Sequence, residues 1–341
     1  MSVAATSAAS RLEAALAAFA AVTARRLPAA RCDEMVAAAC LIGAWTQHPD
    51  GADVGGALCA DGTPIEASLN FDAQGRVETR LVTDVAAGVA ATDFAARRAA
   101  VAARCRAFAG EEAAALVEDL AATHLAELPA STRALAFLGA GASAARPLHR
   151  MFYFSFAGLT ARAVEAQLAG RIDAAIVTQF QALARRLDAT VMGVGYDIEA
   201  GRCVKAQLYA RFSCDAATDL RARVAPAQDE GVARAAGLLS TLLAPMRAAT
   251  NDVFLGFGVA MSPGAPPRIG ARLNCALAPH GVTDFAAVDH ALAPLAGRWR
   301  AAPDLTGLAD AFMPTMLSAG ATGGERVAVY FKPQGLAPRR G

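Results

Sequence analysis

The feature that most constrains this chain is a repeat of paired strands. Extended pairs bounded by turn residues lie at 63–85, 133–156, 188–212 and 251–277, and a last strand lies at 324–333. The intervening stretches have the apolar spacing of helices, at 89–126, 159–187, 215–248 and 282–318. Turn residues at the centre of the pairs, such as Gly75 and Gly201, are typical of hairpins. The repeat therefore predicts serial ββαα units of the α/β (α+β) class, with about ten antiparallel strands closed into a barrel and helices outside.

One strand of the repeat, GRCVKAQLYARF (201–212), has an unusual polar face. Alternate side chains in a strand point the same way, so Lys205, Gln207, Tyr209 and Arg211 share one face. The opposite face is apolar and is available for packing against helices. In an open sheet the polar face would be solvated, whereas in a closed barrel it would line an interior that needs an anion.

The second strands of the other pairs carry the same kind of face in the same register. The matching positions are Arg76, Glu78 and Arg80; His149, Met151, Tyr153 and Ser155; Arg268, Gly270, Arg272 and Asn274; and Arg326, Ala328, Tyr330 and Lys332. The register is basic or tyrosyl in every repeat, although the whole chain has a net charge of only +1. This pattern favours a shared cationic interior over a solvated face.

Composition excludes several other classes. There is no long basic tract, so binding to nucleic acid or to an anionic membrane is not expected. The seven cysteines are scattered and include no CxxC pair, which indicates reduced thiols in a cytoplasm and no zinc site. No apolar run reaches 18 residues, so no membrane span is expected. We expect helices over 1–50 packing on a single barrel domain at 51–333, and a tail at 334–341.

A cationic, tyrosine-bearing interior suits a diphosphate ester. Arginine and lysine give charge-assisted hydrogen bonds to phosphate oxygens, and tyrosine rings attract a cation. The chain has no P-loop, no GxGxxG at a strand–helix junction and no DDxxD box that would hold Mg²⁺. Without such a box, the positive side chains of the protein must neutralise most of the negative charge of a bound diphosphate. Assistance by Mg²⁺ stays open, and no metal ligand can be named.

At this point the residues indicate a family. The serial ββαα units, and a K-x-Q-x-Y strand that follows a G-x-G-x-D strand, resemble the ABBA (PT-barrel) prenyltransferases. The stretches IEASLNF (65–71) and GVGYDIEAGRCVKAQLYARF (193–212) look most like the cyanobactin-type peptide prenyltransferases. The resemblance covers residues 55–333 and implies an allyl diphosphate donor, usually dimethylallyl. It also implies ionisation to an allyl cation, which a nucleophilic side chain of a peptide acceptor then captures.

The resemblance also assigns roles to residues. It implies a diphosphate site of Arg80, Lys205, Arg272 and Lys332, a cation shield of Tyr153, Tyr209 and Tyr330, and further lumen positions at Gln207, Arg211, Arg268 and Asn274. Glu66 matches the acidic residue that contacts the acceptor or takes its proton. Because a carboxylate beside cations has a low pKa, we expect Glu66 to be ionised.

Two departures bear on the acceptor. The chain has only four tyrosines, and Arg272 stands where an aromatic residue is expected. Few residues follow the last strand, so we expect an open barrel mouth, which suits a peptide. Two alternatives remain: prenylation of a free aromatic or amino-acid acceptor, and a non-catalytic barrel that binds an anionic hydrophobic ligand. The acceptor atom, the prenyl length and the oligomeric state are not determined by the sequence.

Overall fold

The computed structural model describes residues 8–46, 56–87, 89, 93–214, 220–261, 268–321 and 324–336. The turn expected inside the fourth strand pair, at 262–267, lies outside these residues. So do 337–341 of the expected tail, as well as 1–7 and 47–55.

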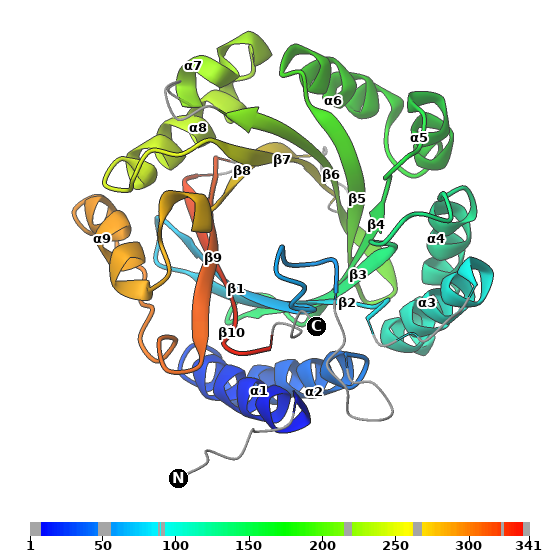
Figure 1. Ribbon diagram of the computed structural model, residues 1–341, viewed down its shortest axis with the longest axis horizontal. Coiled ribbons are helices and arrows are strands. Elements are labelled where there is room, and N and C mark those ends of the chain that lie inside the picture. Colours follow the sequence, from blue (N-terminus) through cyan, green and yellow to red (C-terminus); the bar gives the residue numbers. More distant parts are fainter. Residues whose placement is uncertain are drawn as a thin grey trace.

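Ten antiparallel strands form one closed barrel, as the strand pairs predicted (Figure 1). The strands are β1 (Ile65–Asp72), β2 (Val77–Asp84), β3 (Ala136–Ser143), β4 (His149–Ser155), β5 (Thr190–Glu199), β6 (Arg202–Cys214), β7 (Asn251–Ala260), β8 (Arg268–Ala276), β9 (Phe312–Gly320) and β10 (Arg326–Pro333). Each strand pairs with its neighbours in sequence, and β1 also pairs with β10. That last pairing closes the barrel and leaves no free sheet edge.

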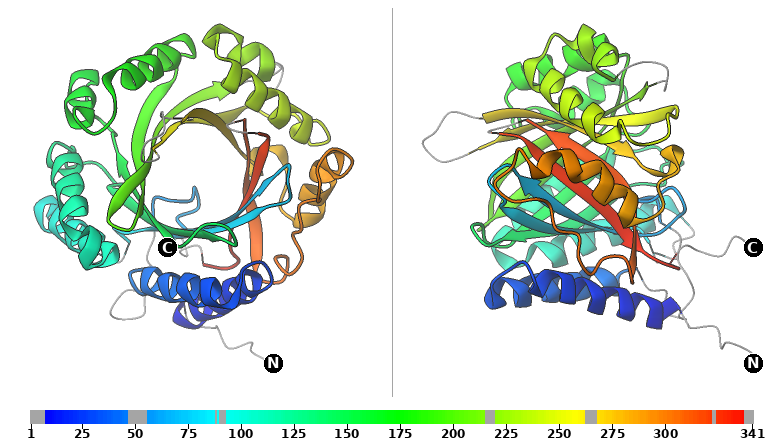
Figure 2. Two further views of the ribbon diagram at one scale, coloured as in Figure 1. Left: turned by 180° about the vertical axis from the view of Figure 1, so that it is seen from behind. Right: turned by 90° about the vertical axis from the view of Figure 1, so that its left-hand side faces the viewer.

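Helices form a ring outside the barrel, seen from both ends in Figures 1 and 2. They are α1 (Ala8–Ala24), α2 (Ala29–Ala44), α3 (Phe94–Ala109), α4 (Ala114–Ala126), α5 (Ala161–Leu168), α6 (Ala174–Arg186), α7 (Leu220–Val224), α8 (Glu230–Leu243) and α9 (Phe285–Ala296). The first two are packed together against the barrel beside β2 and β3.

Local sequence explains where many of these helices begin. The N-cap residues Asp93, Thr160, Asp173, Asp229 and Asp284 each accept a hydrogen bond from a backbone N–H in the first turn. Such caps satisfy donors that have no partner inside the helix.

The hydrophobic core lies between the barrel and the helix ring. One side-chain face of each strand points into this layer, as Leu69, Phe152, Leu208 and Leu255 do, and these residues are fully buried. The other face lines the lumen. The alternation seen in the sequence therefore places the packing residues on the outer face of each strand and the residues of the candidate site on the inner face.

The prediction of helix over all of 282–318 was wrong. Helix α9 ends at Ala296, and β9 begins at Phe312. A β-bulge hides this strand in the sequence, because the pairing with β10 passes from Met316 to Pro314 and leaves Thr315 without an opposite residue. The extra residue interrupts the two-residue alternation that marks a strand.

The two ends of the barrel differ. The hairpin turns lie at one end, and the connections to the helices leave from the other. At this second end, residues 56–64 precede β1, and Figure 1 shows them inside the ring of strands. We call residues 56–64 the strap. Among the described residues, no helix is long and apolar enough to cross a membrane.

Candidate active site

Glycines let large side chains lie flat inside the lumen. A Cβ added at Gly195 would come within 2.6 Å of the Tyr153 ring, and one at Gly256 within 2.0 Å of the Gln207 amide. The G-x-G pattern within these strands thus marks close approach of neighbouring side chains to the backbone. The glycines of β5 and β7 thus give room to the polar side chains of β4 and β6.

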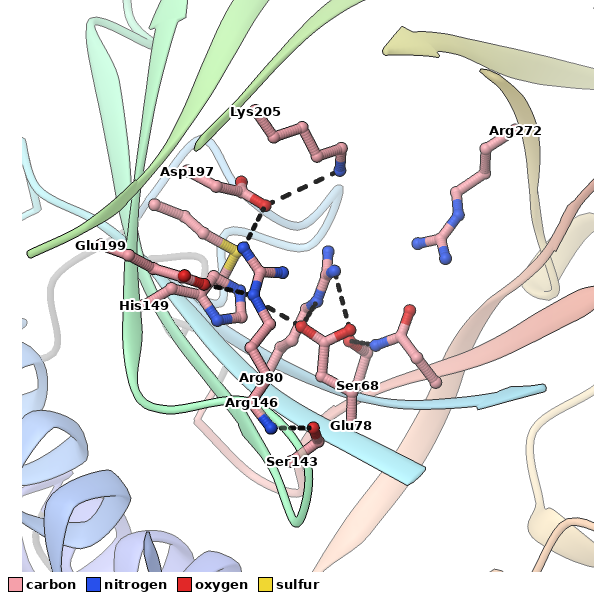
Figure 3. Close-up of polar contacts among 12 residues, drawn as sticks. Ser68, Glu78, Arg80, Ser143, Arg146, His149, Asp197, Glu199, Lys205 and Arg272 are labelled. Carbon is pink, nitrogen blue, oxygen red and sulfur yellow. Dashed lines mark hydrogen bonds and ion pairs between the residues drawn. The ribbon is translucent and has the colours of Figure 1, made fainter. Parts of the chain in front are cut away.

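Three of the predicted cations face one another across the lumen. Arg80 comes from β2, Lys205 from β6 and Arg272 from β8, and Figure 3 shows Arg272 extending toward the other two. Burial lowers the pKa of Lys205 to about 8; Asp197 opposes this shift, and the nearby positive charges of Arg80 and Arg272 add to it. Like charges held this close in a protein favour an anionic ligand.

The lumen is less cationic than predicted, because it also contains carboxylates, of which the half-buried Glu78 is the first. Arg80 donates from Nε to Glu78 Oε1 at 3.0 Å and from Nη2 to Oε2 at 2.9 Å. The buried His149 ring places Nε2 3.2 Å from Glu78 Oε1. Although burial alone would favour protonation, the charge of Arg80 holds the pKa of Glu78 well below its usual range.

Asp197 is the second carboxylate of the lumen; it is buried, and it lies between two cations. Its Oδ2 atom is 3.8 Å from Lys205 Nζ and 3.9 Å from an Arg146 nitrogen, and Arg146 also pairs with Glu199 (Figure 3). Burial raises the pKa of Asp197, but Lys205 and the other cations outweigh it, so the carboxylate is ionised. Oδ2 has no hydrogen-bond partner within the described protein.

Three of the four tyrosines lie in the lumen. The rings of Tyr153 and Tyr209 meet edge to face, with centroids 5.9 Å apart, and Arg272 donates to the Tyr330 hydroxyl at 3.4 Å. Burial raises the pKa values of Tyr153 and Tyr209, so both hydroxyls stay neutral. Tyr196 points outward instead and contacts His124 in the helix layer. The lumen therefore has three rings that can face a carbocation.

Glu66 faces the lumen near its helix-connection end. Thr315, the unpaired residue of the β9 bulge, donates to Glu66 Oε1 at 2.6 Å. The prediction of a low pKa was wrong: burial raises the pKa of Glu66 to about 7, and the opposing effects of Thr315 and Lys332 are smaller. The positive charge of Lys332 lowers the pKa of Glu66 by less than burial raises it.

Lys332 does not join the other predicted diphosphate residues. Its ammonium group makes an ion pair with Asp61 in the strap. The pKa of Asp61 is lowered, because hydrogen bonds and charge from Lys332 and Thr63 outweigh the opposing effect of burial. The structure thus brings Arg80, Lys205 and Arg272 together and leaves Lys332 beside Glu66.

The further predicted lumen positions divide into two groups. Gln207 and Asn274 are buried, and Asn274 donates to the carbonyl of Phe254 at 3.0 Å. Arg211 and Arg268 are exposed at opposite ends of their strands. The Nη1 atom of Arg211 lies 3.7 Å from Asp252 Oδ2. These two arginines belong to the rims of the barrel.

Sequence reasoning assigned no role to Asp61, Asp197 or Thr315, although Asp197 ends the G-x-G-x-D motif. Asp197 could have been found, because it continues the alternation of Gly193 and Gly195 on β5. Comparing only the second strand of each pair overlooked it, since the first strands supply the other half of the lumen. Thr315 and Asp61 carry no such signal, because one is in a bulge and the other in a loop.

We find no group of three or more His, Cys, Asp or Glu residues arranged to hold a metal ion within the described part of the chain. None of the seven cysteines forms a disulfide within the described residues.

A closed antiparallel barrel of ten strands with helices outside is the PT-barrel (ABBA) fold of prenyltransferases, so the fold predicted from the sequence is confirmed. No protein-family model matches the sequence, and neither does any curated protein. Solved structures do share the fold at low sequence identity.

The 5-dimethylallyltryptophan synthase of Streptomyces coelicolor is 17% identical with a TM-score of 0.67, over 98% of this chain and 100% of that one. The prenyltransferase PriB, solved with L-tryptophan and dimethylallyl thiolodiphosphate, is 15% identical with a TM-score of 0.67, over 98% and 99%. The 6-dimethylallyltryptophan synthase of Micromonospora olivasterospora is 16% identical with a TM-score of 0.66, over 96% and 97%. At these identities the similarity establishes the fold alone.

Proposed function

We propose that this chain is a prenyltransferase that moves an allyl group, dimethylallyl in the simplest case, from its diphosphate to an acceptor in the lumen. The observation that carries the proposal is the convergence of Arg80, Lys205 and Arg272 beside three tyrosine rings. The likeness to solved prenyltransferases, some bound to a dimethylallyl thiodiphosphate and tryptophan, supports the same reaction class.

The cations would bind and stabilise the leaving group. As the carbon–oxygen bond of the allyl diphosphate breaks, the electron pair leaves with the diphosphate, and negative charge grows beside Lys205 and Arg272. Arg80 is partly occupied by Glu78, but its Nη1 takes no part in that pair. It can therefore donate to a phosphate oxygen without losing its orienting partner.

The tyrosine rings and Glu66 would act on the other half of the reaction. Tyr153, Tyr209 and Tyr330 shield the allyl cation from water and attract it through their faces. The acceptor's electrons form the new bond to carbon, and the acceptor then loses a proton. Glu66, with a pKa of about 7, is suited to hydrogen-bond an acceptor N–H or to take that proton.

The acceptor is an electron-rich side chain, either on a peptide, as the strand motifs suggested, or on a free aromatic amino acid. Tryptophan complexes of the same fold favour the second form. Both forms present the same ring to Glu66, so they differ in size at the barrel mouth and not in the chemistry.

The test is product formation, measured by mass spectrometry after incubation with dimethylallyl diphosphate and either L-tryptophan or a tryptophan-containing peptide, with and without Mg²⁺. We expect a mass gain of one dimethylallyl group, strongly reduced in Glu66→Gln and lost in Lys205→Ala/Arg272→Ala. Donor binding without product on any aromatic acceptor would instead support the non-catalytic barrel. Unchanged activity in both variants would overturn the assigned site.

A further inference from the structure

The strap is tied at two points to one side of the barrel mouth. Near its start, the backbone N–H of Ala57 donates to Asp84 Oδ2 at 2.6 Å, at the end of β2. Near its centre, Asp61 pairs with Lys332 at the end of β10. Because β2 and β10 are the two neighbours of β1, these ties span three adjacent strands of the wall.

Internal hydrogen bonds give the strap a defined shape. Gly56 N–H donates to the carbonyl of Gly62 at 2.7 Å, and Thr63 N–H donates to Asp61 Oδ1 at 3.1 Å. The second bond orients the Asp61 carboxylate, while its other oxygen receives Lys332. The strap is therefore a compact loop closed on itself, and the Ala57–Asp84 hydrogen bond and the Asp61–Lys332 ion pair hold it to the barrel.

The strap lies over the residue that we assign to the acceptor. Cys59 Sγ, inside the strap, lies 4.0 Å from the carbonyl oxygen of Ile65, the residue before Glu66, and the charge of Lys332 lowers the pKa of Glu66. Glu66 is also only two residues from Pro64, the last residue of the strap. An acceptor ring at Glu66 would thus have the strap as its roof.

The opposite end of the barrel is charged and suits the donor. There the hairpins bring Arg146 and Glu199 to Asp197, which pairs with Lys205 (Figure 3). A bound diphosphate would occupy the space between these groups and Arg272. The acceptor would then lie toward the strap end, beside Glu66.

We propose that the strap, latched by Asp61 and Lys332, limits the size of the acceptor, so that the closed barrel takes a free aromatic amino acid and excludes the same residue within a peptide. This inference rests on the proposed prenyl transfer. It departs from the expectation of a peptide acceptor, because residues 56–64 lie inside the ring of strands at this end and pair there with Lys332.

Asp61→Asn tests the latch, because it removes the charge and keeps the shape. The matched control is Asp119→Asn, which breaks an exposed ion pair with Arg171 far from the mouth. The first readout is labelling of Cys59 by N-ethylmaleimide, located by peptide mass spectrometry. We expect about tenfold faster labelling in Asp61→Asn and no change in the control.

The second readout is the ratio of kcat/KM for a tryptophan-containing pentapeptide to that for L-tryptophan. We expect wild type to use the free amino acid, and the ratio to rise about tenfold in Asp61→Asn. Equal use of both acceptors by wild type, or faster labelling with an unchanged ratio, would overturn the strap's role and leave the proposed function standing. Absence of transfer to either acceptor by wild type would overturn the proposed function, and the strap's role with it.

Discussion

Lys205 and Asp197 are opposite each other on β6 and β5, and the Lys205 ammonium nitrogen lies 3.8 Å from Asp197 Oδ2. This carboxylate does not fully offset the burial of Lys205, nor the positive charges of Arg80 and Arg272. The Lys205 amine therefore loses its proton near pH 8, and the positive charges around it favour the binding of an anion.

The first prediction is a loss of donor affinity at alkaline pH. Lys205 has a pKa of about 8, so it is charged below that pH and loses its proton above it. The Kd for dimethylallyl thiodiphosphate should rise about tenfold between pH 7.5 and pH 9. Lys205→Met should bind weakly with little pH dependence. A pH-independent Kd in wild type would show that Lys205 does not contact the donor.

The second prediction concerns Glu66 and the acceptor. Because the pKa of Glu66 is raised to about 7, the carboxylate form increases as the pH rises through 7. With saturating donor, kcat/KM for the acceptor should rise over pH 6–8, and Glu66→Gln should remove this rise while keeping wild-type donor affinity. The same rise in the variant would assign the pH dependence to another group.

The third prediction tests the close packing of the lumen. Gly195→Ala places a methyl group 2.6 Å from the Tyr153 ring, so it should lower the free energy of unfolding by about 1–3 kcal/mol and displace a shielding ring. Prenyl transfer should fall by more than donor binding does. Gly297→Ala is the control, because nothing lies within 4 Å of its added Cβ and its φ is −87°. We expect urea unfolding to place this control near wild type, and equal losses in the two variants would contradict the packing account.

The fourth prediction concerns the helix layer. His124 Nε2 lies 2.9 Å from the Tyr196 hydroxyl oxygen, and His124 Nδ1 lies 3.1 Å from Gln167 Oε1. Burial lowers the pKa of His124 from 6.5 to about 4. The unfolded chain then binds more protons between these values, so stability is lost as the pH falls from 6.5 toward 4. At pH 5 the loss from this residue should be about 2 kcal/mol relative to pH 7.5. Urea unfolding of wild type and His124→Gln at the two pH values measures it, and equal pH dependence in both would contradict it.

The barrel could be predicted from sequence because its evidence is local and repeated. Alternating strands, hairpin glycines such as Gly201 and helical spacing recur along the chain, and each repeat supports the others. At the fifth repeat the signal failed, because the Thr315 bulge interrupts the alternation of β9. Half of the fifth hairpin was therefore assigned to a helix.

The candidate site could be predicted only where one strand carries the signal. Arg80, Lys205 and Arg272 share a register that can be compared from repeat to repeat. The pairing of Lys332 with Asp61 joins two segments far apart in the chain, so no periodicity reports it. The pKa of Glu66 depends on desolvation, which is a property of the closed barrel and not of the neighbouring residues in sequence.

The central claim is that Lys205 and Arg272 form a diphosphate site in the lumen. Calorimetric titration with dimethylallyl thiodiphosphate tests it most directly, on wild type, on Lys205→Ala/Arg272→Ala, and on the control Arg211→Ala/Arg268→Ala. The control removes two positive charges from the exposed rims of the same strands. We expect micromolar binding in wild type and in the control, and a loss of at least about a hundredfold in the lumen variant. Absence of binding in wild type, or an equal loss in both variants, would contradict the account.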